Sequence, residues 1–169
     1  VCSKSDAAGN AATPQTFTVT VRDTTAPLIT VPGAQTFEAT AVLSTPTLTL
    51  ASTTDAVSTT TIALSYSPTS FGVGTTVATW TARDGAGNSA TATSSVTIVD
   101  TTAPFLTAPA SILTEATTAS TIVSLGSPSV SDLVDASPTV TNNAPATFPV
   151  GATSVVWRAT DSRSNSTTS

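Results

Sequence analysis

The chain has 169 residues, of which 39% are hydrophobic and only 9% are charged, and its formal net charge is −5. Its five Lys and Arg residues are spread too widely to form a basic patch for phosphate contacts, which argues against nucleic acid as a partner. With no His, no Met and a single Cys, Cys2, it lacks most of the usual nucleophiles, proton shuttles and transition-metal ligands, so we predict that it is not an enzyme. It also lacks an apolar run of the length that spans a membrane.

The first segment, residues 1–23, combines a turn with a strand. The turn sequence DAAGN at residues 6–10 precedes FTVTV at residues 17–21, where apolar and hydroxyl side chains alternate as in a strand with one buried face. Turns similar to DAAGN occur at residues 84–88 and 161–165. We therefore expect residues 1–23 to be the C-terminal tail of a preceding repeat, and the chain to be a piece of a longer array.

The second segment, residues 24–100, reads as a complete repeat. DTTAP occurs at residues 23–27 and again at 100–104, 77 positions later, and several other motifs return at the same spacing. Residues 75–82 and 96–98 alternate as strands do, and Trp80 shares one face of its strand with Ala78 and Ala82. We predict that the Trp80 side chain fills the core of this repeat.

The third segment, residues 101–169, reads as a second immunoglobulin-like repeat without its last strand. Its strand around Trp157 keeps Val155 and Ala159 on the same face as the indole, so Trp157 is also predicted to lie in a core. The counterparts of residues 96–99 would fall beyond Ser169, outside the sequence.

The local signals favour an all-β fold. Thr and Val are stiff at χ1 and favour strands, and no helical pattern with caps is sustained. Several short strands between Pro, Gly and Asp turns fit an antiparallel sandwich of the immunoglobulin type. The Pro of each DTTAP fixes its own φ and keeps the preceding Ala extended, which makes a stiff linker. The predicted architecture is a tandem of immunoglobulin-like antiparallel β-sandwiches joined by short stiff linkers.

The motifs of the complete repeat resemble, in order, those of the hyalin repeat. They are DTTAP (23–27), LITVP (28–32), FEAT (37–40), FGVGTTV (71–77), WTARDGAGN (80–88) and VTIVD (96–100). The resemblance covers nearly the whole chain. It implies tandem immunoglobulin-like modules of secreted and surface-attached proteins, with roles in extracellular adhesion or scaffolding.

The chain departs from this family at its cysteines. The family commonly has Cys where Trp80 and Trp157 stand, with a partner near the position of Ala92, whereas only Cys2 keeps that residue here. A buried indole is the simplest replacement for the crosslink. Cys2 itself either pairs with a residue upstream of the chain or is a free thiol.

Most of the ten acidic residues fall in predicted linkers and turns. Because these turns lie at the end of an immunoglobulin-like sandwich where the chain enters, we expect the acids to gather at two joints. Carboxylates that converge with Asn and backbone oxygens suit Ca²⁺, a hard ion that takes six to eight oxygen ligands. The predicted ligands are Asp23, Asp55 and Asp84 at the first joint, and Asp100, Asp132, Asp135, Asp161 and Glu38 at the second.

A second interpretation of these acids needs no metal. Asp and Asn are common in turns because their side chains bond to nearby backbone amides. A catalytic carboxylate pair is disfavoured, because Glu38 and its counterpart Glu115 are one repeat apart and do not share a cleft.

Two functions are open from the sequence. The first is structural: a tandem array that forms a stalk, sheath or filament at the cell surface, with copies of itself or neighbouring repeats as partners, and with strand donation between subunits as one route to a fibre. The second is an adhesive module that binds carbohydrate or protein, or a spacer for a remote enzyme domain. The sequon Asn165-Ser166-Thr167 permits N-glycosylation, and the predicted location is extracellular.

Overall fold

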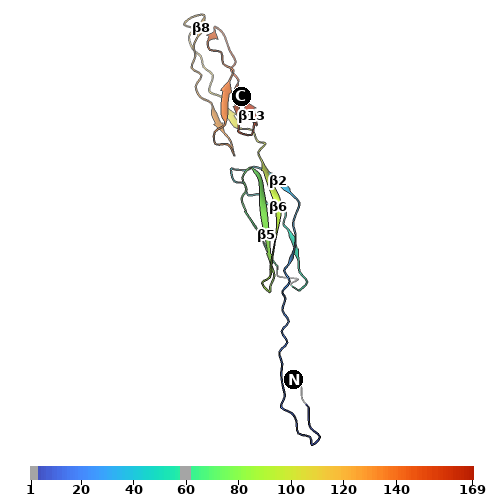
Figure 1. The fold of residues 1–169 in the computed structure, drawn as a ribbon. Coiled ribbons are helices and arrows are strands. Elements are labelled where there is room, and N and C mark those ends of the chain that lie inside the picture. Colours follow the sequence, from blue (N-terminus) through green and yellow to red (C-terminus); the bar gives the residue numbers. More distant parts are fainter. Residues whose placement is uncertain (1–3, 58–61) are drawn as a thin grey trace.

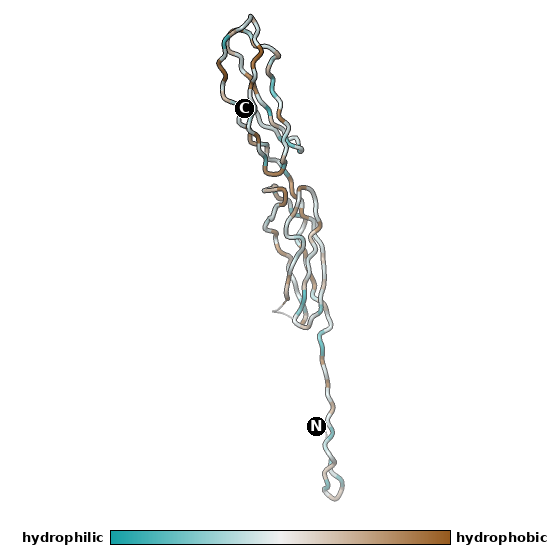
Figure 2. The backbone as a smooth tube through the Cα atoms, turned by 90° about the vertical axis from the view of Figure 1, so that its left-hand side faces the viewer, coloured by the Kyte–Doolittle hydropathy of each residue, from teal (hydrophilic) through white to brown (hydrophobic). Residues whose placement is uncertain are grey.

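In a computed structural model, which describes residues 4–57 and 62–169, the chain is elongated, with two β-modules arranged end to end (Figure 1). The N-terminal tail projects from the outer end of the first module, and a view turned by 90° shows the same extended shape (Figure 2). The described residues form strands and turns but no helix. The prediction of an all-β chain of tandem sandwich modules is confirmed.

The described part of the first module has six strands in two sheets. They are β1 (Leu28–Thr30), β2 (Gln35–Glu38), β3 (Ser52–Thr54), β4 (Ala63–Ser67), β5 (Gly74–Arg83) and β6 (Ser89–Val99). The strands β1 and β3 pair with each other, and the second sheet has the order β2-β6-β5-β4. The long strands β5 and β6 are antiparallel, whereas β2 runs parallel to the end of β6.

The core of the first module is built on one face of β5 and β6. Ala78, Trp80, Val96 and Ile98 alternate with outward-facing residues and are at most 1% exposed. The indole N–H of Trp80 donates a hydrogen bond to Ser94 Oγ at 2.9 Å, which satisfies its one polar group inside the core. Ala92, at the position where the hyalin repeat resemblance places the partner cysteine, lies directly opposite Trp80 in the strand register. The prediction that Trp80 fills the core is confirmed.

The second module repeats this plan with shorter strands. They are β7 (Phe105–Thr107), β8 (Ser120–Thr121), β9 (Ser129–Ser131), β10 (Thr139–Asn142), β11 (Phe148–Pro149), β12 (Trp157–Thr160) and β13 (Ser166–Thr168). Pairs β7 with β9 and β8 with β11 accompany a sheet of order β10-β12-β13. The strands β7, β9, β12 and β13 stand 77 positions after β1, β3, the end of β5 and the start of β6.

The core of the second module is more open than that of the first. In the first module the end of β6 pairs with β2 on one side and with β5 on the other. The counterpart of this segment would have numbers above 169. Among the described residues no strand lies between residues 112–115 and 151–156, which are themselves not assigned as strands. Ala159 is fully buried, but Trp157 is only partly buried. The prediction that Trp157 lies in a core is therefore only partly correct.

The N-terminal tail forms the predicted turn, whereas its role as the last strand of a preceding repeat stays a prediction. Ser5 bridges to Ala11 around the turn at residues 6–10, so the hairpin is formed. Residues 17–21 are extended but unpaired, and Phe17 and Val21 are 78% and 91% exposed. An alternating sequence becomes part of a sheet only where a neighbouring strand supplies hydrogen bonds and an apolar surface, and no strand of the described residues pairs with this segment.

Candidate metal centre

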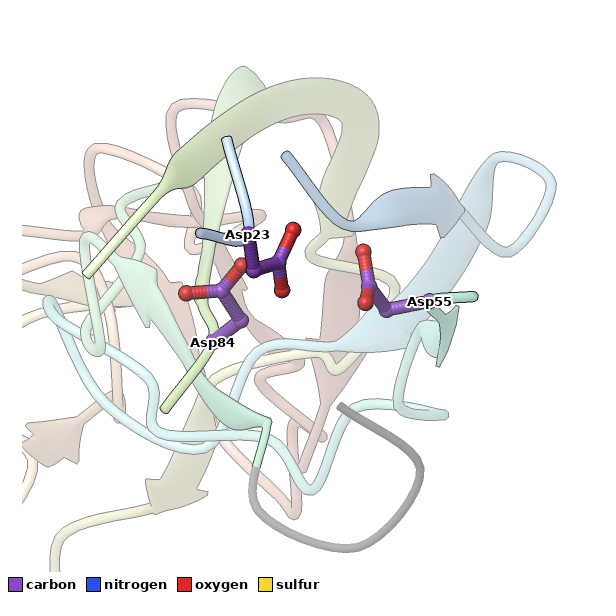
Figure 3. A group of neighbouring side chains, drawn as sticks. All are labelled: Asp23, Asp55 and Asp84. Atoms are coloured by element: carbon purple, nitrogen blue, oxygen red, sulfur yellow. The ribbon is translucent and has the colours of Figure 1, made fainter. Parts of the chain in front are cut away.

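Each module brings three aspartates together at the end where its linker enters. In the first module, Asp23 lies in the linker, Asp55 directly follows β3 and Asp84 directly follows β5. Their carboxylates face one another, with one oxygen from each within 4.8 Å of the others (Figure 3). The chain must turn after β3 and after β5, and both turns lie at the end of the sandwich where the linker arrives.

The second module has the same arrangement. Asp100 lies in the linker, Asp132 follows β9 and Asp161 follows β12, and their carboxylate oxygens also lie within 4.8 Å of one another. Every member of this trio stands 77 positions after its counterpart in the first trio. We refer to Asp23, Asp55 and Asp84 as the first trio and to Asp100, Asp132 and Asp161 as the second trio.

One carboxylate oxygen of each linker aspartate closes a short local turn. The Thr25 N–H donates to Asp23 Oδ1 at 3.1 Å, and the Thr102 N–H donates to Asp100 Oδ1 at 3.3 Å. The loop aspartates do the same, since the Val134 N–H donates to Asp132 Oδ1 at 2.8 Å. The Oδ1 atoms of these residues therefore have hydrogen-bond donors within their own turns, as Asp residues in turns commonly do.

The third aspartate of each trio is held by an asparagine four residues later. Asp84 accepts hydrogen bonds from both the backbone N–H and the side-chain amide of Asn88, each at 2.8 Å. The same side-chain amide donates to the backbone carbonyl of Asp23 at 3.3 Å, which ties the turn to the linker. Asn165 makes the equivalent bonds to Asp161 and, at 3.1 Å, to the carbonyl of Asp100.

The second carboxylate oxygen of each linker aspartate, Oδ2, is not part of such a turn. Asp23 Oδ2 and Asp100 Oδ2 are buried atoms to which none of the described residues donates a hydrogen bond. Burial raises the pKa of Asp100, and the negative charges of Asp161, Asp132 and Glu38 raise it further. An anion that is desolvated beside other anions is costly unless a cation or a donor accompanies it.

The pKa values of Asp84 and Asp161, the two aspartates held by asparagines, are shifted in the opposite direction from that of Asp100. Burial raises the pKa of Asp84 and of Asp161, but hydrogen bonds from Asn88 and Asn165 and from the turn amides outweigh this effect. The pKa of each therefore lies below its usual value, and each is an anion at neutral pH. Each trio thus offers converging carboxylate oxygens to a hard cation such as Ca²⁺, whose remaining ligands would come from backbone carbonyls or water.

Two of the predicted ligands lie close to the second trio without belonging to it. Glu38 accepts hydrogen bonds from the Thr101 N–H at 2.7 Å and from the Thr101 and Thr102 hydroxyls, so it holds the linker. The bond from the Thr101 amide is the main reason that the pKa of Glu38 is lowered. Asp135 accepts bonds from the backbone amides of Ser162 and Ser137, both at 2.8 Å.

The other predicted sites have different outcomes. The Asn165 amide nitrogen, to which a glycan would be attached, donates the two side-chain bonds described above. Glycosylation would replace one of its two hydrogens and so remove one of these bonds, and it stays a prediction. Glu115 is exposed and lies between β7 and β8 of the second module, whereas Glu38 is in β2 of the first. Cys2 lies outside the described residues, so its pairing stays a prediction.

Sequence reasoning did not single out Val134, and it marked Asn165 as a glycosylation site and Asn88 only as part of a turn, not as donors to the linker. Val134 follows the second trio's loop aspartate and packs against the core cluster of the first module, across the joint. Its counterpart Val57 is 66% exposed. The signal was present, because Val57, Asn88 and their counterparts recur at the 77-residue spacing of the aspartates.

The fold and the repeated trios define a class of tandem immunoglobulin-like modules with an acidic cluster where each linker enters. The family model of the HYR domain matches residues 22–98 and 99–169. The chain therefore belongs to the hyalin repeat (HYR) family, a family of structural repeats of the extracellular type, as the motifs of the sequence suggested. A comparison with curated proteins found no match. Within residues 4–57 and 62–169, no helix has the length and hydrophobicity needed to cross a bilayer.

Proposed function

We propose that the chain is a non-enzymatic structural module of a secreted or cell-surface protein, in which tandem repeats form a stalk, sheath or filament. In this proposal a divalent cation, Ca²⁺ first among them, binds each trio and stiffens the array. One observation carries the proposal: in each of the two modules, three aspartates at equivalent positions converge at the point where the linker enters. Bracing at that point fixes the angle between modules, which is the property a stalk requires.

The contacts around the second trio support a role in joining the modules. The linker that contains Asp100 is held from the first module by Glu38 and from the second module by Asn165. The loop that contains Asp132 also carries Val134, which packs against the first module. A cation bound to the trio would therefore draw the linker, this loop and the Asn165 turn to one point. It would also offset the mutual repulsion of the carboxylates.

The first module presents the same surface to a neighbour on its N-terminal side. Val57, the counterpart of Val134, is 66% exposed, and the linker of the first trio has the same DTTAP sequence. An exposed apolar side chain at a joint position is suited to contact with a preceding module. The repetition of joint residues, and not only of core residues, favours an array over two unrelated domains.

A ligand-binding role has less support from the described residues. Binding sites for carbohydrate usually expose an aromatic platform with polar groups beside it. Phe71 and Trp80 are instead buried, and the ring of Tyr66 packs against Trp80 with centroids 4.9 Å apart. Phe17 and Phe105 are exposed, but one lies in the tail and the other in β7, so they do not form one platform. We therefore do not propose adhesion to a saccharide as the function.

Small-angle X-ray scattering tests the stiffening directly. At concentrations where the chain is monomeric, we expect the profile in calcium to fit a single extended particle, and the profile in chelator to require an ensemble of bent ones. The variant Asp132→Asn should behave in calcium as the wild type does in chelator, because it removes one ligand of the joint. Profiles that are identical with and without calcium would rule out a cation-stiffened joint.

A further inference from the structure

One side chain of the second module belongs to the core of the first. Val134, in the loop after β9, is half-buried and packs against the buried cluster that contains Phe71, Trp80 and Ile98. All other described members of that cluster, and the other hydrophobic residues packed against it, lie in the first module. The preceding side chain in the loop, Leu133, is 60% exposed. The loop therefore directs one aliphatic side chain across the joint and the other to solvent.

The end of the first module at the joint has a fixed shape. Its loop of residues 39–44 follows β2, whose last residue holds the linker. Ser44 and Phe71 exchange two backbone hydrogen bonds of 2.8 Å, and the Ser44 hydroxyl accepts a bond from the Thr40 N–H at 3.0 Å. Phe71 is 1% exposed. A surface that is already ordered loses little conformational entropy when a neighbouring module packs against it.

The loop of Val134 also connects this side chain to the second trio. The Val134 and Asp135 N–H groups both donate to Asp132 Oδ1 at 2.8 Å, so a carboxylate of the trio holds the backbone of the residue that crosses the joint. Asp135 in turn accepts a bond from the Ser162 N–H at 2.8 Å, which ties the loop to the turn after β12. Whatever fixes the Asp132 carboxylate therefore fixes the position from which the Val134 side chain leaves the loop.

The linker is held from both modules beside this loop. Glu38 of the first module accepts the bond from the Thr101 N–H at 2.7 Å, and Asn165 of the second module donates to the carbonyl of Asp100 at 3.1 Å. Pro104, at the end of the linker, is fully buried. The linker, the loop and the Asn165 turn each carry one carboxylate of the second trio, and the first module contacts both the linker and the loop.

We infer that Val134 couples the second trio to the core of the first module, so that a cation bound in one module stabilises the module before it. The inference rests on the proposed cation-braced array and adds a regulation to it, because the stability of a module then depends on the cation site of the module that follows. By linkage the coupling is reciprocal, so Val134 in contact with the first module strengthens cation binding by the same factor. A stabilising contact between neighbours makes the modules of an array cooperative.

Order in the loop is the property that both events share. Without a cation, the three carboxylates repel one another, which favours loop positions in which Asp132 lies farther from Asp100 and Asp161. Val134 then leaves the first module and exposes its methyl groups to water. A cation draws Asp132 back to the other two carboxylates and returns the side chain to the cluster. The regained apolar burial is the stabilisation that the first module receives.

Hydrogen exchange tests the coupling in a chain that carries Asp55→Asn, so that the first module has no cation of its own. In this chain we expect calcium to slow the exchange of the β5 and β6 amides about three- to tenfold relative to chelator, since these amides exchange when the first module opens. Native mass spectrometry of the same sample measures whether an ion is bound at the second trio.

Val134→Ala, added to Asp55→Asn, removes the proposed contact. It should abolish most of the calcium-dependent slowing in the first module while one ion still binds, and it should raise the calcium Kd of the second trio by the same factor of about three to ten. Leu133→Ala is the matched control, because that side chain lies in the same loop but is exposed. The control should leave both effects unchanged.

An ion that binds at the second trio without slowing exchange in the first module overturns the inference and leaves the cation site in place. A slowing that survives Val134→Ala, or that Leu133→Ala removes equally, also overturns the inference alone. A chain to which no ion binds overturns the cation proposal and the inference together.

Discussion

Replacing Asp100 with Asn should change the stability of the second module in opposite directions with and without calcium. In chelator, Asp100 is a half-buried carboxylate with a buried Oδ2 atom beside other carboxylates, so removing its charge relieves repulsion and raises the melting temperature of that module. In calcium, the same substitution removes a ligand, so the module loses its calcium-dependent stabilisation. Asn keeps an oxygen that accepts the bond from the Thr102 N–H.

The size of the calcium effect follows from linkage. At a free calcium concentration of one hundred times Kd, a site present only in the folded state adds about 2.7 kcal/mol. For a module of this size, each kcal/mol shifts the melting temperature by about 4–8 °C, so the increment is about 10–20 °C. The Asp100→Asn variant should lose this increment for the second module and keep it for the first, which retains its own trio.

Differential scanning calorimetry in calcium and in chelator measures both effects. Asp135→Asn is the matched control, because it removes the same charge from a residue that lies next to the second trio but outside it. The control should keep the calcium increment. An Asp100→Asn variant that melts below the wild type in chelator, or that keeps the full increment in calcium, would refute the assignment of the second trio as a cation site.

Three other predictions concern the core, the clamp and pH. Trp80→Ala should lower the free energy of unfolding by about 3–5 kcal/mol in chemical denaturation, whereas Trp157→Ala should cost less, because Trp157 is only partly buried; equal losses would contradict the difference between the two cores. In thermal melts, Asn165→Ala should destabilise the second module by about 1–3 kcal/mol, because it removes the amide that donates to the carbonyl of Asp100. The control Asn10→Ala, in the tail turn, should leave the stability of both modules unchanged. The folded state binds the proton of Asp100 more tightly than the unfolded state does, because the pKa of Asp100 is raised from 3.8. In chelator, the difference in unfolding free energy between the wild type and Asp100→Asn should therefore fall as pH rises from 3.8 through the raised pKa. A rise of that difference over the same range would contradict the prediction.

The repeat, the fold class and the residues of the trios were accessible from the sequence. Strands with period-two alternation and a fixed 77-residue spacing defined the modules, and the repetition of Asp23, Asp55 and Asp84 placed them on equivalent turns. The same spacing also marked Trp80 as a core residue. These features depend on local sequence pattern and on strand register, and both can be compared between the two repeats of the chain.

The burial of individual residues was less accessible. Trp157 has the same local pattern as Trp80, but it is more exposed because the strand that covers Trp80 comes from residues 93–99, whose counterparts fall outside the sequence. Phe17 and Val21 are predicted as strand residues for the same reason as Val96 and Ile98, yet no strand of the described residues pairs with them. An alternating sequence indicates which side chains a strand can bury, but it does not indicate whether a neighbouring strand is there to cover them.

The composition of the site also depended on geometry that spacing does not encode. Glu38 and Asp135 were grouped with the second trio as ligands, but both use their carboxylates to hold backbone amides of the linker and of a turn. Which acids converge and which bond to nearby amides is decided by side-chain direction at each turn. That direction follows from the three-dimensional path of the chain.

Native mass spectrometry of the monomeric chain in calcium tests most directly whether the two trios are cation sites. We expect two bound ions per chain, one after Asp55→Asn or Asp132→Asn, and none after both substitutions together. Asp135→Asn should keep two. A chain that binds no calcium above the level of the double variant would contradict the cation-braced joint on which the proposed function depends.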